Sequence, residues 1–390
     1  MTPEVKKRIE QIRQGIVPEG YVKDKDGIYP RDWASKKIGQ WLKLAERSIV
    51  LQDEEEYQLV TIRRGFGGVD SRGSFLGKNV LVFLPQDGTN IQMFNLMMQL
   101  PHYKRLFYLM SDGVHIEKLL FKTQDWMKRT LAMPLLKEQK KIAEILSTQD
   151  KAIELQERKI EELKRFKKGC LEKMFPRKGQ KVPEKRFPGF TDDWEQRKVS
   201  TIASDTRGGG TPATSNETYW SGNIPWIQSS DLSEGKLFGV EPRKYISRDG
   251  LNNSATQLVP ENSIAVVTRV GVGKLAFMPF SYTTSQDFLS LCKLQTEPHF
   301  TVYALYQMLQ GELQAVQGTS IKGMTKDDLL SKSIFAPKDE VEQQQLGSYF
   351  RNLDTLITLH QRKLEEMKKQ KKALMQLLLT GIVKTKGEVR

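Results

Sequence analysis

The residues in this sequence whose types suit a specific chemistry are polar and basic side chains in predicted loops. Gln228-Ser229-Ser230, Thr268-Arg269 and Thr319-Ser320 each lie where the local pattern predicts the end of a strand or helix. Amide, guanidinium and hydroxyl groups offer the donors and acceptors that read base edges in the major groove of DNA. These loops therefore indicate recognition of nucleic acid.

The loop from Arg269 to Lys274 is the strongest candidate in the second half of the chain. Its glycines, Gly271 and Gly273, would allow the backbone to approach a phosphate closely, although an ordinary solvated β-turn would have the same composition. The predicted DNA contacts in this half are Arg207, Thr211, Gln228, Ser229, Ser230, Arg269, Gly271, Gly273, Lys274, Thr319, Ser320 and Lys322.

The first half contains a basic, glycine-rich counterpart, TIRRGFGGVDSRGSFLGK, at Thr61–Lys78. Arginine at such a site can bridge phosphates or read guanine. A charged turn that faces only water is the alternative. The predicted contacts are Arg63, Arg64, Arg72 and Lys78.

No set of residues has the spacing of a catalytic, nucleotide or metal site. A P-loop requires a glycine five residues before its Gly-Lys pair and Ser or Thr after it; relative to Gly273-Lys274, those positions hold Thr268 and Leu275. There is no HExxH, no Asn-Pro-Pro-Tyr, and only four scattered histidines. We therefore expect no catalytic residue and no bound metal or cofactor in this chain.

An internal repeat supplies the elements that must position these loops. Residues 138–174 match residues 342–378 when one copy is shifted by 204 positions. Because the repeat occurs only twice, it predicts two similar halves, each a globular unit followed by a long helix. The identical pairs are Glu138/Glu342, Gln139/Gln343, Asp150/Asp354, Ile153/Ile357, Arg158/Arg362, Lys159/Lys363, Glu161/Glu365, Glu162/Glu366, Lys164/Lys368, Lys167/Lys371 and Lys168/Lys372.

Both copies carry apolar residues at alternating steps of three and four, as in a coiled-coil seam. A helix of about 37 residues is about 55 Å long and exposes an apolar stripe unless it has a partner. We therefore expect the two helices to pair antiparallel, with an ordinary bundle or a homodimeric coiled coil as the alternative. Lysines near the helix ends, including Lys167 and Lys371, are predicted to face solvent or to line DNA. The predicted seam residues are Ile142, Ile145, Leu146, Ile153, Ile160, Leu163 and Phe166, and Leu346, Tyr349, Phe350, Leu353, Ile357, Leu364, Met367 and Leu374.

Proline and glycine divide the chain further. A proline-rich linker precedes Asp193-Trp194, which matches Asp32-Trp33. The predicted fold is α/β, with two mixed domains that contain twisted sheets, joined by an antiparallel helix pair with pseudo-twofold symmetry. The predicted segments are an N-terminal helix and connection (1–28), a shortened first domain (29–133), a first long helix (134–175), a linker (176–190), a second domain (191–336), a second long helix (337–381) and a tail (382–390).

The two globular domains differ in length. Trp33 to Glu138 is 105 residues and Trp194 to Glu342 is 148, so the first domain is 43 residues shorter. The alignment places the shortfall near Leu81–Pro85, where the second domain has β-branched strands and a Gly-rich turn. Since deleted strands expose edges and apolar faces, we expect impaired reading by the first domain.

Composition limits the class of protein. The 390 residues carry a formal net charge of +14, which favours a polyanionic partner. No stretch approaches the roughly 18 consecutive apolar residues of a membrane span, and the charged N-terminus lacks the apolar run of a secretion signal. Cys170 and Cys292 have no metal-like spacing, so we expect a cytoplasmic location.

The order of short motifs in the second half resembles a known family. The motifs are RGGGTP (207–212), Tyr219-Trp220, IPWIQSSDL (224–232), TRVGVGKL (268–275), GTSIKGM (318–324) and then a helix that opens near Pro337. This order, with the duplication, resembles the target-recognition domains and conserved spacer helices of the specificity subunit of type I restriction–modification enzymes. The linker phrase Lys185–Phe190 is a further mark of that family, and the resemblance covers essentially the whole chain.

The resemblance implies a non-catalytic subunit that reads a split sequence in double-stranded DNA, one half per domain. It also implies that the paired helices set the gap between the halves and dock two methyltransferase subunits, to which restriction–translocase subunits are added. Those partners would hold S-adenosylmethionine, ATP and Mg. The residues expected to contact a partner are Gln139, Gln343, Arg158 and Arg362. The alternatives are a coiled-coil scaffold that binds only proteins and, less simply, a nuclease.

Overall fold

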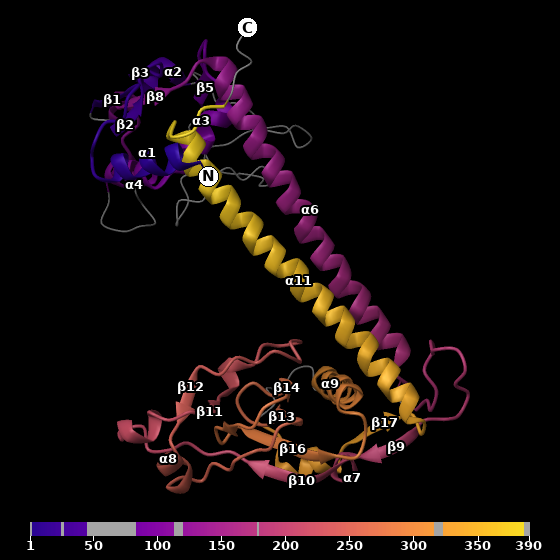
Figure 1. Cartoon of the computed structure of the whole chain (residues 1–390). Coiled ribbons are helices and arrows are strands. Elements are labelled where there is room, and N and C mark those ends of the chain that lie inside the picture. Colours follow the sequence, from indigo (N-terminus) through magenta and orange to yellow (C-terminus); the bar gives the residue numbers. More distant parts are fainter. Residues whose placement is uncertain are drawn as a thin grey trace. The chain divides into compact units, whose positions relative to one another are not determined.

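The computed structural model of the chain describes residues 2–24, 27–44, 83–112, 120–177, 179–315 and 323–385. It divides into two compact units (Figure 1). Unit 1 comprises Met1–Arg158 and Gln361–Arg390, and unit 2 comprises Lys159–His360. Within the described ranges, no helix combines the length and the apolar character needed to span a membrane.

Two long helices, α6 (Leu136–Met174) and α11 (Glu340–Leu379), each contribute to both units. In unit 1, Asp150 of α6 pairs with Lys371 of α11. In unit 2, Lys167 of α6 pairs with Asp354 of α11.

The predicted antiparallel direction of the helices is found inside both units. In unit 1, Ile142 and Leu146 lie in one core with Leu378, whereas Asp150, further along α6, meets Lys371, which is earlier in α11. In unit 2, Cys170 lies beyond Lys167 and contacts Tyr349, which precedes Asp354. The predicted seam is buried at Ile142, Leu146, Ile160, Leu163, Leu346, Phe350 and Ile357. The prediction for Phe166 is wrong, because its side chain is exposed.

Unit 1 consists of short strands and helices around one apolar core. Trp33, Trp41, Phe94 and Trp126 are buried in this core, together with the parts of α6 and α11 that belong to the unit. Pro101 has no amide hydrogen to donate to the preceding turn, and it begins a new helix at that point. The elements before α6 are α1 (Pro3–Arg13), β1 (Tyr21–Asp24), β2 (Gly27–Pro30), β3 (Ala34–Lys37), α2 (Ile38–Trp41), β4 (Leu42–Leu44), β5 (Phe83–Pro85), α3 (Ile91–Met98), α4 (Pro101–Leu109), β6 (Ser111–Asp112), β7 (Leu120–Phe121), α5 (Thr123–Met127) and β8 (Thr130–Met133).

Unit 2 contains a four-stranded antiparallel sheet in the order β10-β16-β13-β14 and a three-stranded sheet in the order β12-β11-β15. A third pair, β9 with β17, lies next to the long helices in the chain. The elements are β9 (Glu195–Lys198), α7 (Val199–Ile202), β10 (Ala203–Gly208), the 3₁₀ turn η2 (Glu217–Trp220), β11 (Ile224–Ile227), the 3₁₀ turn η3 (Ser229–Asp231), β12 (Lys244–Ile246), α8 (Arg248–Asn252), β13 (Ser263–Val267), β14 (Leu275–Met278), β15 (Thr283–Thr284), β16 (Phe288–Leu294), α9 (Pro298–Ala315), α10 (Lys326–Ser331) and β17 (Ser333–Ala336).

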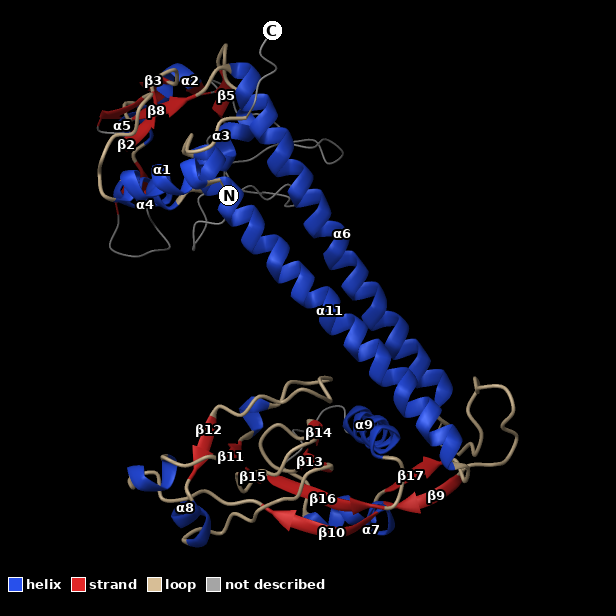
Figure 2. Ribbon diagram, viewed as in Figure 1, coloured by secondary structure: helices blue, strands red, loops and turns tan. Residues whose placement is uncertain are grey.

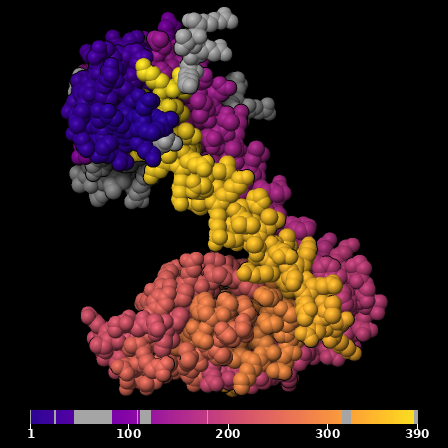
Figure 3. All heavy atoms as spheres, viewed as in Figure 1, coloured from indigo at the N-terminus to yellow at the C-terminus, as the bar shows by residue number. Residues whose placement is uncertain are grey.

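Both faces of the four-stranded sheet are covered, which explains the apolar run of β13. Successive side chains of a strand point to opposite faces. Ile264 and Val266 lie in the core cluster that contains α9, whereas Ala265 and Val267 lie in a second cluster with Ile227 of β11. Figure 2 shows α9, seen nearly end-on, beside β13 and β14. In the space-filling view, the described pink-to-orange residues of unit 2 are closely packed against one another (Figure 3).

The repeat extends beyond the long helices into the flanking elements. In each unit a buried tryptophan, Trp33 or Trp194, precedes a strand, a one-turn helix and a second strand. The first of those strands pairs with the strand that leads into the long helix, as β3–β8 and β9–β17. Both tryptophans are thus core residues of their own unit.

Trp126 and Leu329 are buried at matching positions, just before β8 and β17. In unit 2, β13 and β14 come between β10 and β16 in the chain. The matching stretch of unit 1, between β4 and β5, is residues 45–82. The predicted loss of strands there lies outside the described residues.

Candidate nucleic-acid interface

The loop predicted as the strongest DNA contact is the turn between β13 and β14. Its backbone closes on itself, because Val267 N donates to Lys274 O at 2.9 Å and Lys274 N donates to Gly271 O at 3.4 Å. Residues 269–271 are exposed. They form the tip of a turn whose base is fixed by the sheet.

Three segments that are distant in sequence meet at this turn. Met324 N donates to Thr268 O at 2.6 Å, Thr268 N donates to Asp287 O at 2.7 Å, and Lys274 Nζ donates to Ser229 O at 3.4 Å. The predicted segments around Gln228–Ser230 and Thr268–Lys274 are thus brought together. The chain that follows Thr319–Lys322 returns beside them at Met324.

The two glycines of the turn have different roles. Gly271 (φ 90°) and Gly273 (φ 97°) both have the left-handed backbone that favours glycine. A Cβ on Gly273 would lie 2.4 Å from Leu313 Cδ1 of α9, and Gly273 is buried. Gly273 therefore serves close packing on α9, and only Gly271 is placed for the predicted approach to a phosphate.

Arg207 and Thr211 come from the segment at the end of β10. Arg207 Nη2 donates to Asp205 Oδ2 at 3.0 Å, so its charge is partly engaged within the strand. Thr211 Oγ1 donates to Gln286 Oε1 at 2.7 Å, and Gln286 immediately precedes the Asp287 that holds Thr268. Thr211 therefore lies beside the segments that meet at the β13–β14 turn.

The glycines between Arg207 and Thr211 allow the close packing of this segment. A Cβ on Gly209 would lie 1.8 Å from Ser285 O, and one on Gly210 would lie 2.5 Å from Thr256 N. No side chain fits in either place without movement of the backbone. The Gly-rich phrase is thus explained by packing, and its conformation needs no bound phosphate.

Gln228–Asp231 forms a compact turn with one exposed serine. Gln228 N donates to Asp231 Oδ2 at 3.0 Å, and Arg243 Nε lies 3.4 Å from Asp231 Oδ1. Ser230 is exposed, whereas Gln228 and Ser229 are half-buried. Arg243 and Gln286 were not predicted, because neither belongs to a motif and only the folded chain brings them to these loops.

Several predicted contacts lie outside the described residues, namely Arg63, Arg64, Arg72, Lys78, Thr319, Ser320 and Lys322. Their roles stay predictions. Among the described residues, no three His, Cys, Asp or Glu side chains form a group that could hold a metal ion.

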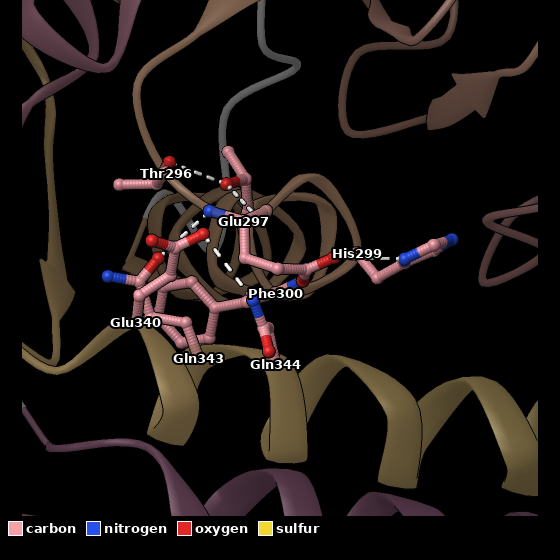
Figure 4. Close-up of polar contacts among 8 residues, drawn as sticks. Thr296, Glu297, His299, Phe300, Glu340, Gln343 and Gln344 are labelled. Carbon is pink, nitrogen blue, oxygen red and sulfur yellow. Dashed lines mark hydrogen bonds and ion pairs between the residues drawn. The ribbon is translucent and has the colours of Figure 1, made fainter.

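The junction of unit 2 with its long helix depends on Gln343 (Figure 4). Gln343 Oε1 accepts from Glu297 N at 2.9 Å and its Nε2 donates to Pro337 O at 2.8 Å. Glu297 Oε2 in turn accepts from Phe300 N at 2.6 Å and caps α9. Burial alone would raise the pKa of Glu297, but the hydrogen bonds from His299 and from the Phe300 amide outweigh it and lower that pKa.

Gln139 repeats this arrangement in unit 1. Its Oε1 accepts from Asn90 N at 2.7 Å, and its Nε2 donates to Gly88 O at 2.9 Å and to Pro134 O at 2.8 Å. Asn90 Oδ1 caps α3 by accepting from Met93 N at 2.8 Å. Both glutamines are buried and fix the start of their long helix within their own unit. Their expected contact with a partner stays a prediction.

Arg158 and Arg362 are exposed on the long helices, as a partner contact requires. Three residues before each lies a leucine, Leu155 or Leu359, whose exposed fractions are 63% and 55%. Residues three apart share one face of a helix. The repeat thus presents the same Leu-x-x-Arg-Lys surface twice.

The whole chain was compared with known proteins. The sequence model of the family described as type I restriction modification DNA specificity domain matches residues 54–165 and 191–369. A putative type I restriction enzyme MjaX specificity subunit from Methanocaldococcus jannaschii is 25% identical over 80% of this chain and 72% of that protein. The MjaVIII specificity subunit of the same organism is 24% identical over 95% of this chain and 88% of that protein.

A solved structure from a study of assembly and conformational transition in the type I R-M system has the same fold. It covers 91% of this chain and 99% of that one, with a TM-score of 0.57 and 14% identity. The family match covers well over half of the chain and includes part of both units. This chain belongs to the family of type I restriction–modification specificity subunits, which carry the DNA specificity domain.

Proposed function

We propose that this chain reads a bipartite sequence in double-stranded DNA, one half with each unit, as the non-catalytic specificity subunit of a type I complex. In unit 2 the reading surface is the cluster formed by the β13–β14 turn, Gln228–Asp231 and Thr211. In unit 1 it includes the predicted Arg63, Arg64, Arg72 and Lys78. The spacing of half-sites follows the geometry of the protein that carries the readers.

The duplication carries this proposal. In both units a tryptophan is followed by a strand, a one-turn helix and a second strand, and the first of these strands pairs with the strand that leads into the long helix. The family match falls on both halves. A repeated reader suits a target of two parts. A scaffold that binds only proteins would not explain why polar and basic loops of unit 2 converge on one turn.

The duplicated helix surface supports two identical partners. Leu155-Arg158 and Leu359-Arg362 offer the same exposed apolar and basic groups, so one partner surface fits both. We assign these sites to two methyltransferase subunits, with restriction–translocase subunits added to that complex. S-adenosylmethionine, ATP and Mg belong to those partners in this proposal, and the complex acts in the cytoplasm.

The first test measures binding of the complex assembled with its methyltransferase to duplex DNA over a series of salt concentrations. Affinity for DNA should fall steeply as salt rises, because neutralised phosphates release counterions. Arg269→Ala should weaken binding and reduce the salt slope by about one, whereas Lys181→Ala, in the linker, serves as the matched control. An affinity that does not depend on salt would support the protein-only scaffold.

The second test maps N6-methyladenine at base resolution after treatment with the assembled enzyme. We expect two short half-sequences separated by a fixed unread gap. Insertion of seven residues after Leu163, with seven at the facing point of α11, should lengthen the gap and leave both half-sequences unchanged. An unchanged gap would contradict the role of the helices in spacing the two readers.

A further inference from the structure

Val270, at the tip of the β13–β14 turn, is an apolar side chain that the fold leaves uncovered. Its exposed fraction is 69%, the highest among the large apolar side chains in the described part of unit 2. Val272, two residues later in the same turn, is half-buried. The turn thus covers one of its valines and exposes the other.

The backbone that carries Val270 is held on both sides. Thr268 is bound through its N and Oγ1 to Asp287 O at 2.7 and 3.1 Å, and Gly273 is packed against Leu313. Because these contacts hold the backbone, a small movement of the loop would not bury the Val270 side chain. A β-branched side chain also has few rotamers to lose on binding, so the residue is preorganised for contact.

The surroundings of Val270 indicate the kind of ligand. Arg269 beside it is exposed, Lys274 closes the turn, and Lys274 Nζ reaches Ser229 O, next to the exposed Ser230. An isolated apolar group within a basic and hydroxyl-bearing surface suits a ligand that is anionic overall and has a small apolar group. In the major groove of DNA, that group is the 5-methyl of thymine.

We propose that Val270 contacts the 5-methyl group of a thymine and so specifies one T·A base pair in the half-site read by unit 2. This inference rests on the proposed function. Arg269 and Lys274 then supply contacts to the phosphates or to neighbouring base edges, and Val270 supplies a discrimination that charge cannot provide. A single exposed valine is common on protein surfaces; its fixed position within the converging loops is what distinguishes this one.

The experiment uses the complex assembled with methyltransferase and a duplex that contains its mapped target. Each thymine of the unit 2 half-site is replaced singly by uracil, which lacks only the methyl group. With the wild-type chain, one replacement should weaken binding about fourfold, the fold-change that corresponds to one buried methyl group. With Val270→Ala, binding to the natural duplex should be a few-fold weaker, and the same replacement should have no further effect.

Val182→Ala, a similarly truncated exposed valine in the linker, is the matched control and should keep the full response to uracil. Thermal unfolding of Val270→Ala should match the wild type, since the side chain has few contacts to lose. Equal uracil responses in wild type and Val270→Ala at every position would overturn the proposal, as would a unit 2 half-site without a T·A pair. Failure of the wild-type complex to select any sequence would instead reject the proposed function.

Discussion

The two units attach their long helices through the same glutamine but differ in the glutamate beside it. In unit 2, Glu342 is buried and receives two bonds from Arg186, Nε to Oε1 at 2.7 Å and Nη2 to Oε2 at 2.8 Å. Trp194 Nε1 also donates to it at 3.3 Å. In unit 1, no described residue forms a hydrogen bond with the buried Oε1 of the equivalent Glu138 or with the buried Nε1 of the equivalent Trp33.

The ion pair between α6 and α11 is also more buried in unit 2 than in unit 1. Lys167 and Asp354 of unit 2 are mostly buried, and Tyr303 of α9 donates its hydroxyl to the second carboxylate oxygen of Asp354. Burial and the Asp354 carboxylate raise the pKa of Tyr303. The equivalent Asp150 is half exposed in its pair with Lys371. The comparison shows that one repeated helix can be held by a complete polar network or by a partial one.

The largest expected effect comes from removal of the Arg186 guanidinium, which pairs with Glu342 in unit 2. Arg186→Ala leaves the Glu342 carboxylate buried without its counter-charge, which should cost about 3–5 kcal/mol of unfolding free energy. Urea unfolding combined with hydrogen exchange should locate the loss in unit 2. Arg177→Ala, which removes an exposed pair with Glu184 in the same linker, should cost at most about 1 kcal/mol. Equal losses from the two variants would refute the special role of the Glu342 network.

The glutamines should behave alike in the two units. Gln343→Ala removes one bond to a backbone amide and one to a carbonyl, and Gln139→Ala removes one bond to an amide and two to carbonyls. Each change should cost about 2 kcal/mol. Gln344→Ala, at the neighbouring exposed position, is the control and should be near neutral. The measurement is the midpoint and slope of urea unfolding. If only one of the two variants lost much unfolding free energy, the two glutamines would have the same geometry but would contribute differently to stability.

The aspartates should separate the units again, by a smaller amount. Asp354→Asn weakens a mostly buried pair and changes the acceptor of the Tyr303 hydroxyl, so we expect a loss of about 1–3 kcal/mol. Asp150→Asn affects a more exposed pair and should cost at most about 1 kcal/mol. Unfolding in low and high salt checks the assignment, because screening should reduce the effect of Asp150→Asn more. The reverse order would contradict the comparison.

The sequence predicted the framework of the protein better than its contacts. The repeat predicted both long helices, and their three-and-four spacing predicted which faces pack. That spacing failed at Phe166, which has the right position in the pattern but is left exposed by the fold. Lys167 was expected to face solvent or DNA and is instead buried against Asp354. Amino-acid composition does not show that Lys167 and Asp354 meet, because the two residues are 187 positions apart in the chain.

The candidate site shows a similar division. Motif types identified the loops of unit 2, since polar and basic residues at strand ends are visible in the sequence. Their convergence depends on backbone bonds such as Met324 N to Thr268 O, which any residue type can make. For the same reason the packing of Gly273 against Leu313 was not predicted, because glycine in a turn and glycine at a close contact look identical in sequence.

The smallest expected change in unfolding free energy is at Glu138, where the substitution should stabilise the protein. Burial raises the pKa of this carboxyl, so the folded state favours the protonated form. The protonated Glu138 carboxyl stabilises the folded state. This stabilisation is fully present below the pKa that Glu138 has in the unfolded chain, and it is lost as pH rises through the higher pKa of the folded protein. Charged Glu138 therefore reduces stability at neutral pH, and Glu138→Gln should increase the unfolding free energy there by about 0.5–1 kcal/mol, the size of one net hydrogen bond.

A pH series of urea unfolding checks both the size and the sign of this effect. The advantage of Glu138→Gln should be greatest at neutral pH and should shrink as pH falls through the raised pKa of Glu138, where the wild-type carboxyl becomes neutral. Glu342→Gln is the matched variant in unit 2. It weakens the charged bonds to Arg186 and should lower stability at neutral pH. If both variants were destabilising to the same extent, Glu138 and Glu342 would be equally well hydrogen-bonded. The proposed difference between the two units would then be wrong.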